Sequence, residues 1–181
     1  MRKKLIFLLI MFNIFSNTNA KSNLLATNFS FNGINGNEIN FSDYKNKIIV
    51  VVNVASRCGF TNQYKDLQTI WTNYKSKDLV VVGVPSDNFK QEPSSNKEIK
   101  DFCETTFGID FPMTEKTNVI GNNAHPFFLW AKENYGRSAV PKWNFHKIII
   151  GKNGKVKNTF SSITNPTSKR FIKSIEEEIK N

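Results

Sequence analysis

Metal-binding and disulfide-forming residues are scarce in this sequence. Its 181 residues include two cysteines, Cys58 and Cys103, and two histidines, His125 and His146. No Cys-x-x-Cys or Cys-x-x-x-Cys motif is present, and neither histidine stands at ligand spacing from a cysteine. These absences argue against a metal site, a copper chaperone and a disulfide isomerase, so neither a metal nor a cofactor is expected. His125 precedes a proline and is expected to cap or pack against a helix, whereas His146 is expected on a strand.

The amino-terminal apolar stretch is too short to cross a membrane. A spanning helix needs about 20 predominantly apolar residues, whereas the run at residues 5–11 is soon interrupted by Asn13. Basic residues at positions 2–4 precede this run, and residues 18–20 supply a small-residue cleavage site. We therefore predict that residues 1–20 are a signal peptide, that the protein is periplasmic or secreted, and that no stable membrane span remains after processing. A retained membrane anchor is the weaker alternative.

Acidic residues are too few to balance the basic ones. Lysine and arginine together number 25 and aspartate and glutamate 15, which gives a formal net charge of +10. The lysines are spread along the chain, without an arginine-rich block or an arranged aromatic–basic repeat. This distribution is typical of a solvated surface with a weak preference for acidic partners, and it argues against a nucleic-acid partner. Repeats, low-complexity tracts and linkers are also absent, so residues 21–181 are predicted to form one domain.

Apolar patterns and turn residues divide the chain into strands and helices. Residues 29–41 surround two Asn-Gly dipeptides and predict a β-hairpin. The β-branched runs 48–54 and 79–84 predict buried strands, with an amphipathic helix between them at about 63–76. The other predicted elements are a helix at about 96–106 with a capping box of Ser95 and Glu98, a short extended piece at 111–113, a helix at 126–135, a hairpin at 145–160 and a terminal helix after Pro166.

This order of elements predicts the fold class. A βαβ unit followed later by a hairpin and a terminal helix implies an α/β protein with a central mixed β-sheet flanked by helices. With the N-terminal β-hairpin, this is the layout of a thioredoxin-like fold. Cys58 then lies at the first turn between a strand and a helix.

Cys58 directly follows the first predicted central strand, and Gly59 after it permits a tight turn. We expect its thiol to be exposed at the carboxyl end of the strand. The neighbouring Arg57 and the amino terminus of the next helix both favour the nucleophilic thiolate. An inert, packed cysteine is the alternative, and export would also permit a structural disulfide with Cys103. The inward stripe of the next helix is expected to be Tyr64, Leu67, Ile70 and Trp71.

Four separated motifs resemble those of glutathione peroxidases, and they occur in the same order. They are Asn-Val-Ala-Ser-Arg-Cys-Gly-Phe-Thr-Asn-Gln-Tyr at 53–64, Gln-Glu-Pro at 91–93, Asn-Ala-His-Pro at 123–126 and Lys-Trp-Asn-Phe at 142–145. The resemblance covers about residues 24–179 and is to the cysteine-containing members of the family. It implies a thioredoxin-like fold, in agreement with the order of elements, and a peroxidase activity.

The resemblance also implies a catalytic set. The nucleophile, glutamine, tryptophan and asparagine of the family map onto Cys58, Gln91, Trp143 and Asn144. Peroxide reduction requires a thiolate that attacks a peroxide oxygen, and neutral amide and indole N–H groups can stabilise the sulfur anion without competing as nucleophiles. Each residue also has a structural alternative: Gln91 as a surface loop residue, Trp143 as core filling and Asn144 as a turn former.

The loop before Gln91 departs from the family pattern. Family members usually have Pro-Cys-Asn-Gln-Phe-Gly before the glutamine, whereas residues 85–91 read Pro-Ser-Asp-Asn-Phe-Lys-Gln. Ser86 therefore replaces a cysteine, and one position is missing. Asn88 is consequently an alternative to Gln91 as the amide near the sulfur. Asp87, if it lies close to the sulfur, opposes thiolate formation.

Cys103 resembles the resolving cysteine of thioredoxin-dependent family members. Such a cysteine condenses with the sulfenic acid of the oxidised nucleophile to form a disulfide. Because a disulfide needs Cα atoms within about 7 Å, a helix that holds Cys103 away from Cys58 has to open locally. We therefore predict a mobile segment at about 94–108. A packed helical cysteine is the alternative.

The segment between Pro126 and Trp143 is short for this family. It leaves little room for the oligomerisation insert of tetrameric members, so a monomer is expected. It also favours a thioredoxin-like protein over glutathione as the reductant. The leading hypothesis is a thiol-dependent peroxidase for hydrogen peroxide and organic hydroperoxides. A peroxide-sensing thiol–disulfide relay and a non-catalytic thioredoxin-fold binding module are the alternatives.

Overall fold

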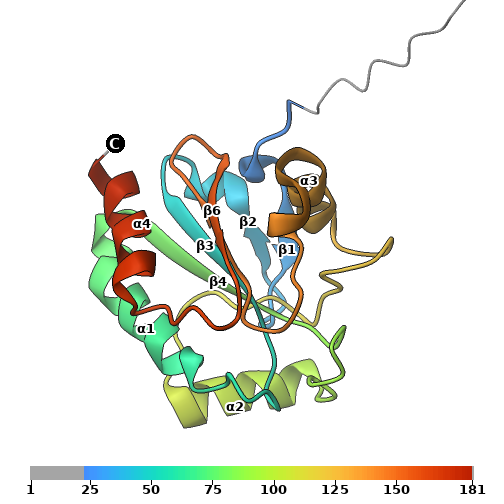
Figure 1. The fold of residues 1–181 in the computed structure, drawn as a ribbon. Helices are drawn as coiled ribbons and strands as arrows, with labels where there is room; N and C mark the ends of the chain where they lie inside the picture. Colours follow the sequence, from blue (N-terminus) through green and yellow to red (C-terminus); the bar gives the residue numbers. More distant parts are fainter. Residues whose placement is uncertain (1–22, 181) are drawn as a thin grey trace, which may run out of the picture.

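The structure is a computed structural model, and it describes residues 23–180 (Figure 1). The predicted signal peptide at residues 1–20 lies outside the described residues. In the described part of the chain, no helix is long and apolar enough to cross a membrane.

A four-stranded mixed β-sheet forms the centre of the molecule. β3 pairs in parallel with β4 and antiparallel with β5, which in turn pairs antiparallel with β6. Every side chain of β3 and β4 is buried, as expected for strands that are covered on both faces. The predicted mixed sheet is confirmed. In sheet order, the strands are β4 (Leu79–Pro85), β3 (Ile48–Val54), β5 (Lys147–Ile150) and β6 (Val156–Phe160).

Helices and a hairpin cover the two faces of this sheet. On one face, α1, α2 and α4 contribute to a core that includes Val50 and Val52 of β3. On the other face, α3 and the predicted N-terminal hairpin pack around Ile49 and Val51. Figure 1 shows α1 and α4 on one side of the sheet, with α3 and the hairpin on the other. The elements are β1 (Ser30–Asn32), β2 (Glu38–Asn40), α1 (Gln63–Tyr74), α2 (Asn96–Phe107), α3 (Pro126–Tyr135) and α4 (Lys169–Lys180).

Local sequence signals set the helix ends where they were predicted. The Ser95 hydroxyl oxygen accepts a hydrogen bond from the Glu98 N–H, and the Glu98 carboxylate accepts one from the Ser95 N–H, so the capping box of α2 is present. Pro126 begins α3, and the Nδ1 atom of His125 accepts a hydrogen bond from the Phe127 N–H. His125 therefore caps α3, as expected.

Lys147 is an unusual residue for a sheet interior, because its side chain is fully buried in β5. Its ammonium group donates to the side-chain oxygen of Gln63 at the start of α1 and to the carbonyl oxygens of Ser162 and Thr164. These partners are neutral, so burial dominates and lowers the pKa of Lys147 from its ordinary value of 10.5 to about 7. Asp66 opposes this shift. The lysine joins α1 and the loop after β6 to the sheet.

We expect Lys147 to contribute a rise in the free energy of unfolding with pH above about pH 7, so that the slope is more positive in the wild type than in a Lys147→Met variant. Between about pH 7 and pH 10.5 the unfolded chain holds a lysine proton that folded Lys147 has released. Raising the pH in this window therefore favours the folded state, by at most ~1.4 kcal/mol per pH unit.

Urea unfolding across this window measures the difference between the two proteins. The comparison cancels the contribution of Cys103, whose raised pKa acts with the opposite sign. Exposed Lys155 provides a matched control, Lys155→Met, which should keep the wild-type slope. Equal slopes in the wild type and in Lys147→Met would contradict the prediction.

Candidate active site

Asn53 in β3 holds the segment that precedes β5. Its Nδ2 atom donates to the Trp143 carbonyl oxygen at 3.2 Å, and its Oδ1 atom accepts from the His146 N–H at 3.1 Å. Its own carbonyl oxygen accepts from the Phe145 N–H at 2.6 Å. Phe145 adopts a positive φ of 63° in this turn. The three bonds place Trp143 and Asn144 beside the strand end that leads to Cys58.

Gln91 and Asn144 meet across the site, although they lie far apart in the sequence. Asn144 is fully buried, and its Nδ2 atom donates to Oε1 of Gln91 at 3.2 Å. Oδ1 of Asn144 in turn lies 3.5 Å from Nδ2 of Asn53. The Trp143 ring packs beside that of Phe89, with centroids 5.5 Å apart, and 40% of the residue is exposed. Trp143 is therefore not a core-filling residue. Gln91 and Asn144 are linked to each other by a side-chain hydrogen bond.

Cys58 is less accessible than we predicted from the sequence. Only 7% of the residue is exposed, so the expectation of an exposed thiol is wrong. The turn folds back onto the core, because Cys58 packs in the same apolar cluster as Tyr64 of α1. The Phe60 N–H donates to the sulfur at 3.4 Å, and the Cys58 N–H donates to the hydroxyl oxygen of Thr61 at 3.2 Å. An N–H directed at sulfur stabilises negative charge on that atom.

The turn that carries Cys58 is tied to the loop that carries Gln91. The Arg57 N–H donates to the Gln91 carbonyl oxygen at 3.1 Å. Next to it, Oε2 of Glu92 accepts from both the N–H and the hydroxyl of Ser56, each at 2.7 Å. Glu92 is fully buried, and burial raises the pKa of its carboxyl, although the Ser56 hydrogen bonds lower it in part. These bonds fix the position of Gln91 relative to the thiol.

The other polar residues of the 85–91 loop have partners elsewhere. Oδ1 of Asn88 accepts from the Val119 N–H at 2.6 Å and from the Ser86 hydroxyl at 3.0 Å. Asp87 is exposed, and one of its carboxylate oxygens accepts from the Glu92 N–H. Asn88 is therefore engaged away from Asn144, and Gln91 is the amide that reaches the site.

Cys103 lies on the buried side of α2 and is 1% exposed. Both cysteines are free thiols in the structure. Burial raises the pKa of Cys103 to about 11. The Tyr64 hydroxyl, which forms no hydrogen bond of ordinary geometry, lies close enough to the sulfur to lower this pKa in part. At neutral pH, Cys103 is consequently a protonated and unreactive thiol.

Three basic residues, Arg57, Lys90 and Lys142, directly precede Cys58, Gln91 and Trp143 in the sequence. All three cations are exposed. No group of histidine, cysteine, aspartate and glutamate side chains suited to a metal ion is found among residues 23–180. The candidate site therefore combines a hydrogen-bonded sulfur, two amides and an indole, each on a segment that also carries an exposed basic residue.

Three contributors to the site escaped the sequence analysis: Asn53, Tyr64 and Glu92. Asn53 is the single polar residue of β3, and this interruption of an apolar strand is a usable signal. Tyr64 was predicted as an inward-facing core residue, and nothing in the pattern indicates that its hydroxyl lies toward Cys103. Glu92 stands in a polar loop, where burial has no local signal.

We expect a thiol-alkylating reagent to modify Cys58 at least tenfold faster than Cys103 in the reduced protein between about pH 7 and pH 8. Cys103 is 1% exposed and its pKa is about 11, so its thiolate is rare in this range. Its modification should accelerate as the pH is raised. Mass spectrometry of the labelled peptides gives both rates, with Cys58→Ser and Cys103→Ser proteins as references. Equal rates for the two thiols would contradict this.

Curated relatives of the chain are peroxide-reducing proteins by name. A family model described as glutathione peroxidase matches residues 26–132. The hydroperoxy fatty acid reductase gpx1 of Synechocystis sp. is 38% identical over 156 residues, which cover 81% of this chain and 92% of that protein. The glutathione peroxidase-like peroxiredoxin 2 of Saccharomyces cerevisiae is 41% identical over 138 residues, which cover 74% of this chain and 85% of that protein.

Solved structures agree with this assignment. The crystal structure of Trgpx in its apo form is 35% identical, with a TM-score of 0.70, and the match covers 88% of this chain and 98% of that one. A thioredoxin-family thiol:disulfide interchange protein from Chlorobium tepidum has a TM-score of 0.62 at 18% identity, covering 83% of this chain and 92% of that one. This second likeness concerns the fold alone, and it confirms the predicted thioredoxin-like fold. The chain belongs to the glutathione peroxidase family.

Proposed function

We propose that the protein is a thiol-dependent peroxidase that reduces hydrogen peroxide and organic hydroperoxides at Cys58. The observation that carries this proposal is the convergence of three groups on the Cys58 turn. The amides of Gln91 and Asn144 are hydrogen-bonded to each other, Trp143 lies beside them, and the Arg57–Gln91 backbone bond ties their loop to the turn. This is the residue set that the family resemblance assigns to catalysis.

The first step consumes the peroxide. The Cys58 thiolate attacks the terminal peroxide oxygen, the O–O bond breaks, and Cys58 becomes a sulfenic acid. The departing alkoxide or hydroxide takes up a proton and leaves as alcohol or water. The Phe60 N–H stabilises the sulfur anion. The side-chain N–H groups of Gln91, Trp143 and Asn144 donate hydrogen bonds to this anion and to the peroxide oxygens, and these neutral groups do not titrate.

The second step protects the nucleophile from further oxidation. The Cys103 sulfur bonds to the Cys58 sulfur, the S–O bond of the sulfenic acid breaks, and water leaves. A dithiol protein then reduces the disulfide by thiol–disulfide exchange. A thioredoxin-like donor is the proposed reductant, with glutathione as the alternative. The yeast relative named glutathione peroxidase-like peroxiredoxin supports a cycle of this type.

The rim of the site suits an anionic, partly apolar substrate. Exposed Trp143 and half-buried Phe89 offer aromatic surface, and the exposed residues Arg57, Lys90 and Lys142, which are sequence neighbours of the site residues, supply positive charge. A carboxylate on an acyl chain complements both features. The Synechocystis relative is named a hydroperoxy fatty acid reductase. We therefore include fatty-acid hydroperoxides among the organic substrates.

We further propose that the protein is exported and that it is a monomer. The basic, apolar and small-residue pattern at residues 1–20 supports a signal peptide and a periplasmic or secreted protein. Between α3 and Trp143 the chain contains only the short helix Gly136–Ala139, which leaves little chain for an oligomerisation insert. A hydroperoxide and a thiol reductant are then the partners that the cycle requires.

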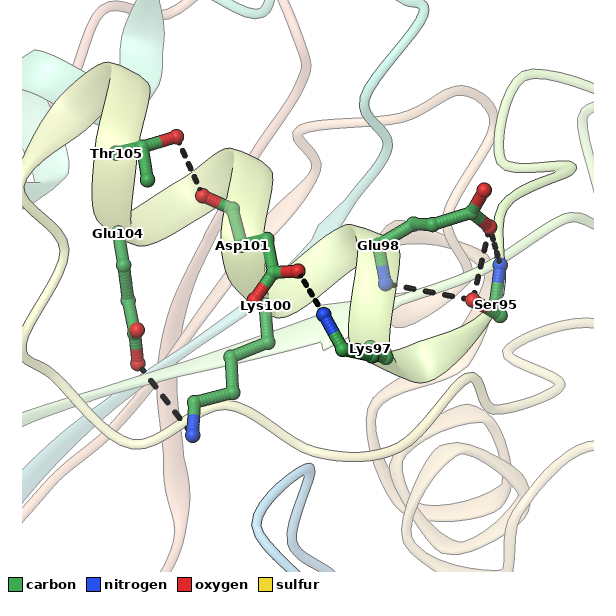
Figure 2. Close-up of polar contacts among 7 residues, drawn as sticks. All are labelled: Ser95, Lys97, Glu98, Lys100, Asp101, Glu104 and Thr105. Carbon is green, nitrogen blue, oxygen red and sulfur yellow. Dashed lines mark hydrogen bonds and ion pairs between the residues drawn. The ribbon is translucent and has the colours of Figure 1, made fainter.

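The helix that carries Cys103 has several polar contacts within itself. Figure 2 shows the capping box of Ser95 and Glu98, together with the exposed ion pairs Lys97–Asp101 and Lys100–Glu104. Exposed pairs at this spacing contribute about 0.3–0.5 kcal/mol each, and an N-cap about 1 kcal/mol. Only Ile99 and Cys103 of α2 are buried. Local opening of α2, which the second step requires, has to release these two residues and the packing of Phe102 and Phe107 against the core.

A Ser95→Ala substitution should make α2 open more readily. Loss of the N-cap is expected to lower the local stability of the helix by about 1 kcal/mol, which corresponds to roughly fivefold faster amide exchange at residues 96–107. Disulfide formation after peroxide addition should accelerate by a similar factor if opening limits it. Hydrogen–deuterium exchange and stopped-flow kinetics measure both rates. Exposed Ser161 offers the control Ser161→Ala, and slow exchange of residues 94–108 in both redox states would contradict a mobile segment.

Turnover tests the proposed function directly. With thioredoxin, thioredoxin reductase and NADPH, we expect the protein to consume hydrogen peroxide, cumene hydroperoxide and a fatty-acid hydroperoxide. Cys58→Ser should abolish NADPH oxidation, because it removes the nucleophile, whereas Cys103→Ser should abolish only the thioredoxin-dependent part. Absence of turnover in the wild type would contradict the proposed peroxidase activity. Rapid disulfide formation without turnover would favour the relay, and an inert Cys58 would favour the binding module.

A further inference from the structure

A second cavity lies next to the segment that carries Trp143, and Cys58 is not among the residues that line it. Its volume is about 220 Å³, far more than the roughly 30 Å³ that one water molecule occupies in the liquid. The cavity therefore has room for a small ligand. The residues that line it come from the short helix Gly136–Ala139, the segment 140–146, β6 and the turn after β6, and they are Arg137, Ser138, Val140, Lys142, His146, Thr159, Ser161 and Ser162.

The wall of this cavity carries positive charge. Arg137 and Lys142 line it, and no lining residue is acidic. Within residues 23–180, neither of these two cations forms an ion pair. A guanidinium group can bind a carboxylate or a phosphate through two parallel hydrogen bonds, and an ammonium group adds a compact positive charge. The wall is thus suited to an anion and unsuited to a metal ion.

His146 brings a buried nitrogen without a partner to the same cavity. Only 7% of the residue is exposed, and its Nε2 atom has no hydrogen-bond partner in the part of the chain that the structure describes. The backbone of His146 is held on both sides by Asn53, which accepts from its N–H and donates to its carbonyl oxygen. Buried polar atoms are nearly always paired, and an exception calls for an explanation such as a bound ion.

The imidazole of His146 is neutral at neutral pH. Burial, together with the positive charges of Lys147 and Lys142, lowers its pKa from the ordinary value of 6.5 to about 4. Arg137 also lines the cavity, whereas no carboxylate does. A neutral imidazole has its proton on one of its two nitrogens, and an acceptor near Nε2 favours the form that has the proton there. An anionic ligand would be such an acceptor.

Hydroxyl groups add neutral donors to the cavity wall. Thr159 lies in β6, and Ser161 and Ser162 follow this strand. The Ser162 carbonyl oxygen accepts hydrogen bonds from the side chains of Gln63 and Lys147, which ties this part of the wall to α1 and β5. Guanidinium, ammonium, imidazole and hydroxyl donors together match the several acceptor sites of an oxyanion. An apolar ligand would leave these donors unpaired, which is costly.

We propose that this cavity binds a small oxyanion, either free phosphate or the carboxylate of a fatty acid. Arg137 and Lys142 supply the opposite charge, and Nε2–H of His146 and the hydroxyl groups donate hydrogen bonds to the anion's oxygens. The inference does not rest on the proposed function, because the cavity and the unpaired nitrogen are independent of the reaction at Cys58.

Nuclear magnetic resonance of the two imidazole groups tests the proposal. At pH 7 and constant ionic strength, phosphate in place of chloride should shift the His146 signals saturably in the millimolar range. His125 does not line the cavity, so its signals are the internal reference. Sulfate keeps the same charge between pH 4 and pH 7, and it should raise the pKa of His146 by about half a unit or more, because a nearby anion favours the imidazolium.

Matched variants separate the cavity from the overall charge of the protein. In calorimetric titrations, Arg137→Met should weaken phosphate binding about tenfold or more, because it removes a charge-assisted donor, and His146→Phe should weaken it about fivefold. Lys155→Met removes the same charge at an exposed residue outside the cavity and should leave the affinity unchanged. Arg137→Lys keeps the charge and should lose less affinity than Arg137→Met.

A second pair of ligands distinguishes the two sources of the oxyanion. If a fatty acid is the ligand, hexanoate should shift His146 and displace phosphate, whereas methyl hexanoate should do neither. If free phosphate is the ligand, hexanoate should have no effect. Either result supports an oxyanion site.

Three results would overturn the proposal. The first is the absence of a saturable His146 shift with both anions, which would mean that the nitrogen is paired with water alone. The second is an equal shift of His125, and the third is an equal loss of affinity in Arg137→Met and Lys155→Met, since both indicate general attraction to a basic protein. Peroxide turnover is not measured in this test, so its failure leaves the proposed function unaffected.

Discussion

The positions of Trp143 and Asn144 in the site depend on the hydrogen bonds of Asn53. An amide inside a strand with apolar neighbours is costly unless each of its polar atoms is paired. In β3 the pairs are available only from the segment before β5, through the Trp143 carbonyl oxygen and the His146 N–H. The same segment is fixed again by the Phe145 N–H. Because this segment is fixed, Trp143 is exposed and Asn144 is buried, and the amide of Asn144 donates to Oε1 of Gln91.

Burial has different effects on the thiols of the two cysteines. At Cys58 it excludes most solvent while leaving a sulfur that accepts a hydrogen bond from a backbone N–H. At Cys103 it raises the pKa of the thiol and shields it from peroxide. These differences favour oxidation of Cys58 over oxidation of Cys103.

Local signals explain which parts of the molecule could be predicted. β3 and the start of α2 were located from β-branched runs and a capping box, because the residues that decide them are neighbours in the chain. The exposure of Cys58 was predicted wrongly, because it depends on how the turn packs against α1 and the core. The hydrogen-bond partners of Glu92 and Asn53 could not be predicted from the sequence either, because they lie 36 and 93 residues away along the chain. Such pairings are set by topology.

The shortened loop before Gln91 illustrates how a local change is absorbed without loss of the site. Lys90 adopts a φ of 56°, a left-handed conformation that is uncommon for a residue with a side chain. The turn is closed by the Lys90 N–H, which donates to the Asp87 carbonyl oxygen, and by the Glu92 N–H, which donates to the Asp87 carboxylate. The strain is confined to Lys90, and the Gln91 carbonyl oxygen still meets the Arg57 N–H. One residue fewer in the loop therefore leaves the glutamine in register with the cysteine, because the bonds on both sides of the strained position fix it.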